Sequence, residues 1–274
     1  MTIKTIAFVV NIRKPESEPI ALKLLEIAAE KKINCKLLTQ YPILKDSLKG
    51  VDVCCTIGGD GTLLSCIEEA ILANVPIFGI NVGKLGFLAS VAIEDAKHVF
   101  CRLLEGQFKK VKRQLLRCTS QQGKVVYALN DVVIKQESYS HLIHLRVSTQ
   151  KESVIEYHAD GLIFSTPTGS TAYNLSANGP ILHPNLKGYV MTPICPHSLI
   201  NRPLVFDSHM HLTVEVCSPS LPEVMVDGRP FEKGINPTPL TLEMSDESIT
   251  LIEPDDYSYF KVLREKLHWT TASP

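Results

Sequence analysis

The stretch Gly58–Thr62, with the sequence GGDGT, constrains the fold more than any other part of this chain. It follows residues 51–57, a short apolar run rich in β-branched side chains that is typical of a buried strand. Apolar residues then recur at i, i+4, i+7 and i+8 counted from Leu63, the spacing of one helix face. The glycines are therefore predicted to form a turn that leads from a strand into a helix.

Such a turn can bind a phosphate group. Glycine has no Cβ to keep an anion away from the main chain, and the N-terminus of a helix attracts negative charge. We call the candidate phosphate-binding residues Gly58, Gly59, Gly61 and Thr62 the phosphate loop. Asp60 would repel phosphate unless it has a function, such as taking a proton from a hydroxyl or helping to hold a metal. The alternative is a tight turn in which Asp60 caps the helix.

Length and charge narrow the class of protein. The 274 residues suffice for one large or two ordinary domains, and a net charge of −1 provides no global basic field for nucleic acid or membrane. No apolar window approaches the length of a membrane span. The eight cysteines form no Cys-x-x-Cys pair and mostly lie in apolar runs, and the apolar run of residues 6–10 is too short for a signal peptide and is expected to be a first strand. We therefore expect core cysteines, neither a zinc site nor a disulfide framework, and a cytoplasmic protein.

Strand and helix patterns alternate over residues 1–106, which predicts a parallel α/β nucleotide-binding domain. One helix is expected to run from the phosphate loop to about Asn74, where Pro76 stops it. A second glycine-bearing loop, residues 81–88, follows the next strand. Ligands bind at the carboxyl ends of strands in such sheets, so the two glycine loops could face one cleft.

Residues 107–274 have a different pattern, with many short strands, an Asp227-Gly228 hairpin signal and a final short helix. We expect a β-rich, sandwich-like second domain that begins near residues 106–114. The basic run 109–113 is interpreted as a solvated connector, the alternative being contact with an anionic ligand or another subunit.

Residues 160–180, which we call the hydroxyl-rich segment, carry many Ser, Thr and Gly residues around Tyr173. Hydroxyls and exposed amides suit a sugar or a nucleobase, and the tyrosine ring can stack on a base. The alternative is a loop that caps a helix. Upstream, Asn130-Asp131 places a carboxylate where it could accept hydrogen bonds from two ribose hydroxyls, or where it simply forms a turn or bulge.

Five motifs, in this order, make the chain resemble the NAD kinase family along nearly its full length. They are GGDGT at 58–62, NVGKLGFL at 81–88, Asn130-Asp131, residues 160–173, and PICPHSL at 193–199 followed by RPL at 202–204. The first motif alone also resembles loops of 6-phosphofructokinases and lipid kinases. The lipid-kinase version has Asn-Glu soon after the threonine, where this chain has Leu64-Ser65.

The resemblance implies transfer of the γ-phosphate of ATP to the adenosine ribose 2′-hydroxyl of NAD, which yields NADP. It also implies a divalent cation, usually Mg²⁺, and a homo-oligomer, either a dimer or a tetramer. The implied fold is an α/β domain and a β-rich domain, in agreement with the patterns above. The alternatives are a related kinase that acts on a lipid or sugar, and an NAD-binding regulator without catalysis.

The resemblance also implies roles for individual residues. Asp60 is the general base with Gly61 beside it, and Phe87 lines the adenosine pocket. Asn130 and Asp131 hold the nicotinamide-side ribose region; the family more often has glutamate at the second position, and the shorter carboxylate of Asp131 reaches less far. The resemblance further implies that Asp160 and the segment of Thr171, Ala172, Tyr173, Asn174, Leu175 and Ser176 bind NAD, often across a subunit interface. His158 is placed near the ligand, and the backbone near Cys195 lies close to the adenosine pocket.

Overall fold

The computed structural model describes residues 3–83, 86–136, 142–198, 200–219, 221–232 and 234–269. The chain divides into two compact units. Unit 1 comprises residues 1–112 and 249–274, and unit 2 comprises residues 113–248.

Unit 1 is built on a parallel sheet whose strand order is β4-β3-β1-β2. The last residues of β17 and the short β5 also pair with β4 in parallel. The strand bounds are Thr5–Val10 for β1, Asn34–Leu38 for β2, Val53–Gly58 for β3, Ile77–Asn81 for β4, Val91–Ala92 for β5 and Leu240–Glu253 for β17. All residues of β3 and β4 and all but the first of β1 are buried, so these sequences are mostly apolar on both faces.

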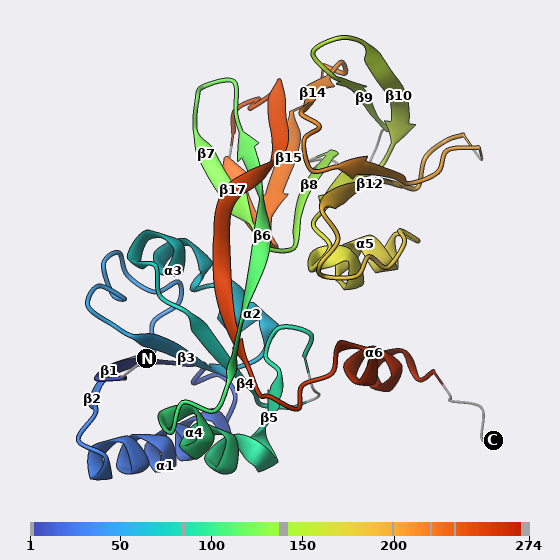
Figure 1. The fold of residues 1–274 in the computed structure, drawn as a ribbon. Coiled ribbons are helices and arrows are strands. Elements are labelled where there is room, and N and C mark those ends of the chain that lie inside the picture. Colours follow the sequence, from blue (N-terminus) through green and yellow to red (C-terminus); the bar gives the residue numbers. More distant parts are fainter. Residues whose placement is uncertain are drawn as a thin grey trace, which may run out of the picture. The chain divides into compact units, whose positions relative to one another are not determined.

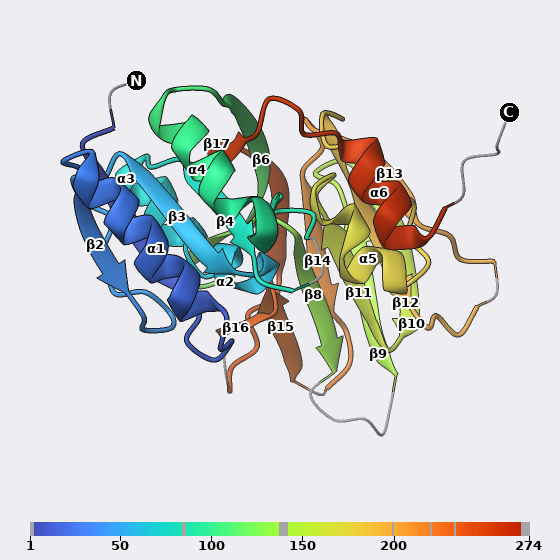
Figure 2. The same cartoon turned by 90° about the horizontal axis from the view of Figure 1, so that it is seen from below.

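Helices cover both faces of this sheet. Figures 1 and 2 show α1 and α4 on one face, with α2 and α3 on the other. Leu24 of α1 and Phe100 of α4 are buried against the sheet, and the rings of Phe8 and Phe100 lie 5.7 Å apart. The bounds are Ser17–Glu30 for α1, Asp60–Leu64 for α2, Ile67–Ala73 for α3, Ile93–Asp95 for the 3₁₀ turn η1 and Ala96–Leu104 for α4.

The expected single helix after Asp60 is instead two short helices, α2 and α3. The side chains of Ser65 and Cys66 both donate to the carbonyl of Thr62, at 2.6 and 3.4 Å, and so compete with the helical hydrogen bonds at the break. The second helix ends at Asn74, which adopts a left-handed conformation with φ 51°, before Pro76 is reached.

Unit 2 contains two layers of antiparallel strands, which confirms the β-rich second domain. One sheet has the order β13-β12-β11-β8-β15-β16. Its strands are Leu204–Asp207, Gly188–Ile194, Gly161–Ser165, Asp131–Gln136, Pro222–Val226 and Arg229–Glu232 in that order. The other layer joins β10 (Ser153–Ala159), β9 (Ile143–Ser148), β14 (Leu212–Val216), the first part of β17, β6 (Lys109–Thr119) and β7 (Val125–Ala128).

The inner faces of the two layers form one core. Phe164 and Met191 from the first sheet lie in the same buried cluster as Leu145, Val147 and Leu212 from the second. Two short helical pieces, η2 (Gly169–Thr171) and α5 (Tyr173–Ser176), lie within the hydroxyl-rich segment. The Asp227-Gly228 hairpin is present between β15 and β16, with φ values of 47° and 74°.

Three features differ from the sequence expectation. Residues 249–274, including the C-terminal helix α6 (Tyr259–Leu267), group with unit 1 rather than with residues 107–248, because the end of β17 pairs with β4. The basic run 109–113 is the start of β6 rather than a connector, and Arg113 is buried. Strands β11 and β12 have no alternating pattern that would reveal them, since nearly all of their residues are buried.

All eight cysteines are free; Cys54, Cys55, Cys66 and Cys118 are buried, as expected for core cysteines, whereas Cys35, Cys195 and Cys217 are exposed. Among the described residues, no helix is long and apolar enough to cross a membrane.

Candidate active site

Unit 1 has a cavity of about 560 Å³ at the carboxyl ends of its strands. In the sheet, β2 lies on one side of β1 and β3 lies on the other. The loops that leave β1 and β3 therefore lead in opposite directions. Ligands of open α/β sheets bind at such a divergence. The cavity is lined by residues that follow β1, β2 and β3 in the chain. They are Asn11, Ile12, Arg13, Lys14, Thr39, Tyr41, Gly59, Asp60, Gly61 and Thr62.

The phosphate loop forms the predicted strand-to-helix turn in this cavity. A Cβ at Gly58 would lie 2.1 Å from Thr62 Oγ1, so the turn tolerates only glycine at that position. The N–H of Gly59 donates to the same Oγ1 at 3.3 Å and so caps the start of α2. The N–H groups of Asp60 and Gly61 stand in the first turn of α2, where no preceding helical carbonyl can accept them. Both are available to an anion.

Asp60 connects the phosphate loop to the second glycine loop. Its Oδ2 accepts the N–H of Phe87 at 2.9 Å, and its Oδ1 accepts those of Leu88 and Ala89 at 3.2 and 2.9 Å. Residue 86 must be glycine here, because a Cβ would lie 2.0 Å from Asp60 Oδ1. The helix-capping alternative is therefore wrong. Lys84 and Leu85 of this loop lie outside the described residues.

These contacts do not use all of the carboxylate. An ionised carboxylate has about four positions for hydrogen-bond donors. Two positions on Oδ1 and one on Oδ2 are occupied by the backbone N–H groups, and within the part of the chain that the structure describes one position on Oδ2 is left. Asp60 is thus held rigidly at the cavity and can still accept one proton or one further hydrogen bond.

Sequence reasoning missed the contribution of the loop after β1. Asn11, Arg13 and Lys14 line the cavity, although the sequence analysis assigned none of them a role. A signal was present, because Arg13 and Lys14 come within four residues of the end of a strand that pairs with β3 in parallel.

In unit 2 the structure brings together motifs that are far apart in sequence. Asn130 precedes β8. Its carbonyl oxygen accepts the N–H of Thr166, a residue of the hydroxyl-rich segment, at 2.9 Å. Gly169 approaches so closely that a Cβ would lie 2.1 Å from the Asn130 carbonyl oxygen. On the other side of the turn, the Asp227 carboxylate accepts the N–H groups of residues 129–131 at 2.9, 2.8 and 3.1 Å.

Asp131 and Asp227 form a buried acidic pair. Burial and, to a lesser extent, the charge of the neighbouring Asp227 together raise the pKa of Asp131 to about 7. Burial also raises the pKa of Asp227, but the three backbone N–H groups that it accepts act in the opposite direction. We assign the proton of the pair to Asp131 near neutral pH, because Asp227 has the hydrogen bonds that stabilise its charge.

The hydroxyl-rich segment presents some predicted residues and uses others internally. The Tyr173 ring is 42% exposed, and Ser176 is also exposed. Asn174, by contrast, is fully buried: its Nδ2 donates to the carbonyls of Ser170 and Pro180, both at 3.0 Å, and its Oδ1 accepts Thr192 Oγ1 at 2.7 Å. The Asn174 side chain therefore supports the segment from inside and has no group left for a ligand. Thr171, Ala172 and Leu175 are half-buried.

Asp160, His158 and Cys195 gather at the opposite end of β11 from Asp131. The N–H of Asp160 donates to Ile194, which precedes Cys195, and Gly161 pairs with Ile194 while Ser165 pairs with Asp131. A strand rises about 3.3 Å per residue, so these two ends are roughly 13 Å apart. All three residues are exposed, and the His158 ring stacks on His144 at 4.3 Å. Leu199 of the PICPHSL motif lies outside the described residues.

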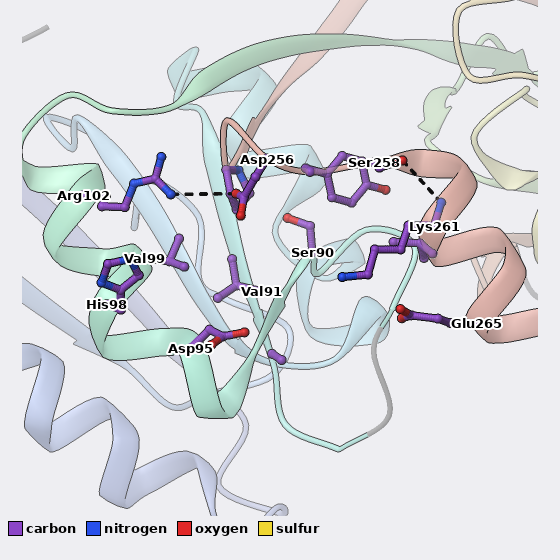
Figure 3. Close-up of a pocket in the computed structure, with 14 residues that line it drawn as sticks. Ser90, Val91, Asp95, His98, Val99, Arg102, Asp256, Ser258, Lys261 and Glu265 are labelled. Carbon is purple, nitrogen blue, oxygen red and sulfur yellow. Dashed lines mark hydrogen bonds and ion pairs between the residues drawn. The ribbon is translucent and has the colours of Figure 1, made fainter.

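A further cavity of about 350 Å³ in unit 1 contains none of the predicted residues (Figure 3). It lies beside β5, α4 and α6, and several of its polar groups already have partners. Arg102 pairs with Asp256 at 3.8 Å, and the Ser258 hydroxyl caps α6 by accepting the N–H of Lys261. We do not assign the chemistry to this cavity.

Comparison with known proteins supplies the family. Sequence models of the ATP-NAD kinase N-terminal and C-terminal domains match residues 39–108 and 129–253. The NAD kinase of Cupriavidus pinatubonensis is 39% identical over 238 residues, which cover 85% of this chain and 78% of that protein. The NAD kinase of Campylobacter jejuni is 36% identical over 82% of this chain and 79% of that protein.

The chain belongs to the ATP-NAD kinase family. Its activity is accordingly that of an ATP-dependent phosphotransferase with NAD as acceptor, and neither a lipid or sugar kinase nor an inactive regulator is supported.

Two solved NAD kinase structures agree in fold. Yeast NADH kinase complexed with NADH superposes with a TM-score of 0.87 at 23% identity, covering 100% of this chain and 90% of that one. An Archaeoglobus fulgidus NAD kinase in complex with ATP gives 0.77 at 21% identity, with coverage of 98% and 99%. At these identities the likeness shows the fold, so the roles of individual residues must be argued from the chain itself.

The buried Asp131 makes stability depend on pH. Its pKa of about 7 in the folded chain exceeds the ordinary value of 3.8. Between pH 3.8 and about pH 7 the folded chain therefore binds a proton that the unfolded chain lacks. Stability should therefore fall as pH rises through this window. Asp131→Asn should remove most of the fall and stabilise the protein by about 2–4 kcal/mol at pH 8, as judged by urea unfolding at pH 5 to 8. Parallel pH profiles for both proteins would contradict the assignment.

Proposed function

We propose that this chain transfers the γ-phosphate of ATP to the adenosine ribose 2′-hydroxyl of NAD, with Asp60 as the general base. The observation that carries the proposal is the state of the Asp60 carboxylate. Three backbone N–H groups hold it in place at the cavity, and one acceptor position on Oδ2 remains. A base so fixed loses little conformational freedom when it meets its substrate.

The proton transfer follows from the chemistry of the hydroxyl. A ribose hydroxyl is a poor nucleophile while it keeps its proton, and a positioned carboxylate can remove that proton during attack. The bond between the 2′-oxygen and the γ-phosphorus forms as the bond from that phosphorus to ADP breaks. The proton moves to Asp60 Oδ2, the oxygen with the open position.

The phosphate loop is proposed to hold the phosphates of ATP. The N–H groups of Asp60 and Gly61 are free of helical partners. Among the described residues, apart from the chain neighbours and the backbone of the same helix, no heavy atom would lie within 4 Å of a Cβ at Gly61. Folding therefore gives no steric reason for glycine at position 61, whereas a phosphate lying against the backbone does. Gly58, Gly59 and Thr62 shape the turn that presents these donors.

The NAD contacts are proposed to come from several places in the chain. Phe87 lies directly beside Asp60 through its N–H and is assigned to the adenosine, as the family resemblance implies. Asn130 and Asp131 are assigned to the nicotinamide-side ribose, held in position by Asp227. In the hydroxyl-rich segment, contacts are assigned to Thr171, Ala172, Tyr173, Leu175 and Ser176, with the Asn174 side chain as their internal support.

His158, Asp160 and Cys195 are proposed to contact an NAD molecule bound mainly by another subunit. Their position at the far end of β11 from Asp131, roughly 13 Å away by strand rise, supports a separate set of contacts. All three residues are exposed in the single chain, which contact with a second subunit requires. We therefore propose a homo-oligomer, either a dimer or a tetramer.

Magnesium is proposed to arrive with ATP. Among the described residues no group of three or more His, Cys, Asp or Glu side chains could hold a metal ion. Mg²⁺ keeps several waters and is commonly bound by substrate phosphates with only one or two carboxylates. Such an ion would neutralise phosphate charge beside Asp60.

The cytoplasm is the proposed compartment. All eight cysteines are free, which is typical of a reducing environment.

A donor and acceptor screen tests the proposal as a whole. The purified protein is incubated with Mg²⁺ and ATP and with NAD, NADH, or candidate lipids and sugars, and NADP or NADPH formation is measured. The proposal requires phosphorylation of the dinucleotide at the 2′-position. Phosphorylation of a lipid or sugar alone, or NAD binding without any product, would refute it.

Asp60→Asn should lower kcat by about 10²–10⁴-fold while NAD binding is largely retained, because the amide cannot take the proton. The variant should also melt earlier, since its Nδ2 cannot accept the N–H of Phe87. Steady-state kinetics at saturating substrates, NAD titration and thermal melting measure these effects. A kcat near that of the wild type would reduce Asp60 to an anchor for the second loop. Loss of Mg-ATP binding with intact NAD binding would reassign it to the metal.

Gly61→Ala should raise stability and lower activity at the same time. Alanine is the better helix former by about 0.5–1 kcal/mol, and its Cβ has open space in the folded chain. The same Cβ would occupy the place proposed for a phosphate, so KM for ATP should rise. Thermal melting and ATP kinetics on one preparation separate the effects. An unchanged KM for ATP would show that no phosphate lies against Gly61.

Tyr173→Ala should weaken NAD binding by about 1–3 kcal/mol, because the exposed ring is proposed to stack on a base. Tyr173→Phe is the matched control, since it keeps the ring and should keep most of the affinity. Calorimetric NAD titration and thermal melting measure both variants. If Tyr173→Ala instead lowers the melting temperature strongly and leaves affinity unchanged, the ring serves the fold and not the ligand.

A further inference from the structure

We propose that Lys14, in the loop between β1 and α1, binds the phosphates of the donor nucleotide. The inference rests on the proposed function and extends it to a residue outside both stretches matched by the family models, residues 39–108 and 129–253. It starts from the position of the ammonium group. Lys14 Nζ donates to the carbonyl oxygen of Gly58 at 2.9 Å and to that of Val82 at 2.5 Å.

These two contacts place the charge between the two glycine loops. Gly58 ends β3 and opens the phosphate loop, and Val82 directly follows β4 in the second glycine loop. A Cβ at Gly59 would lie 3.2 Å from Lys14 Nζ, and one at Gly83 would lie 3.9 Å from it. The ammonium therefore lies on the side of Gly59 where a side chain would otherwise project, and Lys14 lines the cavity.

The charge of Lys14 is not balanced within the part of the chain that the structure describes. Its two recorded partners are neutral carbonyls, and the nearby Asp60 carboxylate is turned toward the N–H groups of residues 87–89. A partly buried ammonium without a counter-charge is unfavourable. An anion in the cavity supplies that counter-charge.

The donor count leads to the same conclusion. A lysine ammonium has three N–H donors, and two of them are used by the carbonyls. The third remains for an oxygen in the cavity, next to the N–H groups of Asp60 and Gly61. Together these groups also offset the repulsion between Asp60 and phosphate, because a cation stands within the same set of loops as the carboxylate.

The alternative is a purely structural lysine that ties two loops together. Lys14→Gln separates the cases, because its amide can still donate to the carbonyls but carries no charge. Lys14→Arg keeps the charge with a different shape. Lys23→Gln, an exposed position on α1, is the control for loss of one positive charge.

Binding of inorganic tripolyphosphate and of ATP is measured by calorimetry without NAD, alongside NAD titration and thermal melting. We expect Lys14→Gln to weaken tripolyphosphate binding about 10-fold or more, as for loss of a hydrogen bond to a charged group. NAD affinity should change less than about twofold, Lys14→Arg should lose less than Lys14→Gln, and Lys23→Gln should match the wild type.

Two results overturn the inference. One is a Lys14→Gln protein that binds tripolyphosphate as the wild type does. The other is an equal loss of NAD and tripolyphosphate affinity together with a lower melting temperature, which indicates a structural tie. The binding readout needs no turnover. A wild-type protein that forms no NADP would therefore refute the proposed function and leave the phosphate contact of Lys14 separately testable.

Discussion

A carboxylate that accepts the N–H groups of three consecutive residues fixes the candidate site in each unit. In unit 1 Asp60 accepts those of residues 87–89, and in unit 2 Asp227 accepts those of residues 129–131. Loop backbone that cannot pair with a strand or helix needs other acceptors, since an unpaired buried N–H costs about 1–3 kcal/mol. One acidic side chain meets that need for a whole turn and sets its conformation.

The two carboxylates differ in what remains available for chemistry. Asp60 lines a cavity, and one acceptor position on its Oδ2 is open. Asp227 is deeply buried, and its charge acts on its neighbour by raising the pKa of Asp131. The same interaction therefore orients a candidate base in one unit and holds the turn proposed to bind NAD in the other. Glycines permit the close approach in both, at Gly86 beside Asp60 and at Gly169 against Asn130.

The parallel sheet supplies the remaining part of the proposed phosphate site. Because β1, β3 and β4 run in the same direction, their following loops meet at one edge. The connections diverge between β1 and β3, which leaves the crevice where the cavity is found. Lys14 from the first loop hydrogen-bonds to the backbone of the other two, so this edge carries a cation as well as free N–H groups.

Local sequence was sufficient for the strand–turn–helix at Gly58–Thr62, the α/β pattern of the first part and the hairpin at Asp227-Gly228, because each depends on neighbouring residues. It also identified the motifs that belong to the family. It could not locate β11 and β12, whose residues are buried on both faces and show no alternation. Nor could it place residues 249–274 with unit 1, since that depends on pairing between β17 and β4.

The roles within the site were decided by tertiary structure. From sequence, Asp60 was equally a helix cap and a catalytic group, and only the contact with residues 87–89 excluded the cap. Asn174 belonged to a binding motif, yet its buried amide bonds the segment internally. Lys14 was assigned no role from the sequence. Spacing along a chain determines which elements form and which residues share a loop. Which atoms meet across 44 or 68 residues, as Lys14 meets Gly58 and Val82, depends on how the sheet brings the loops together.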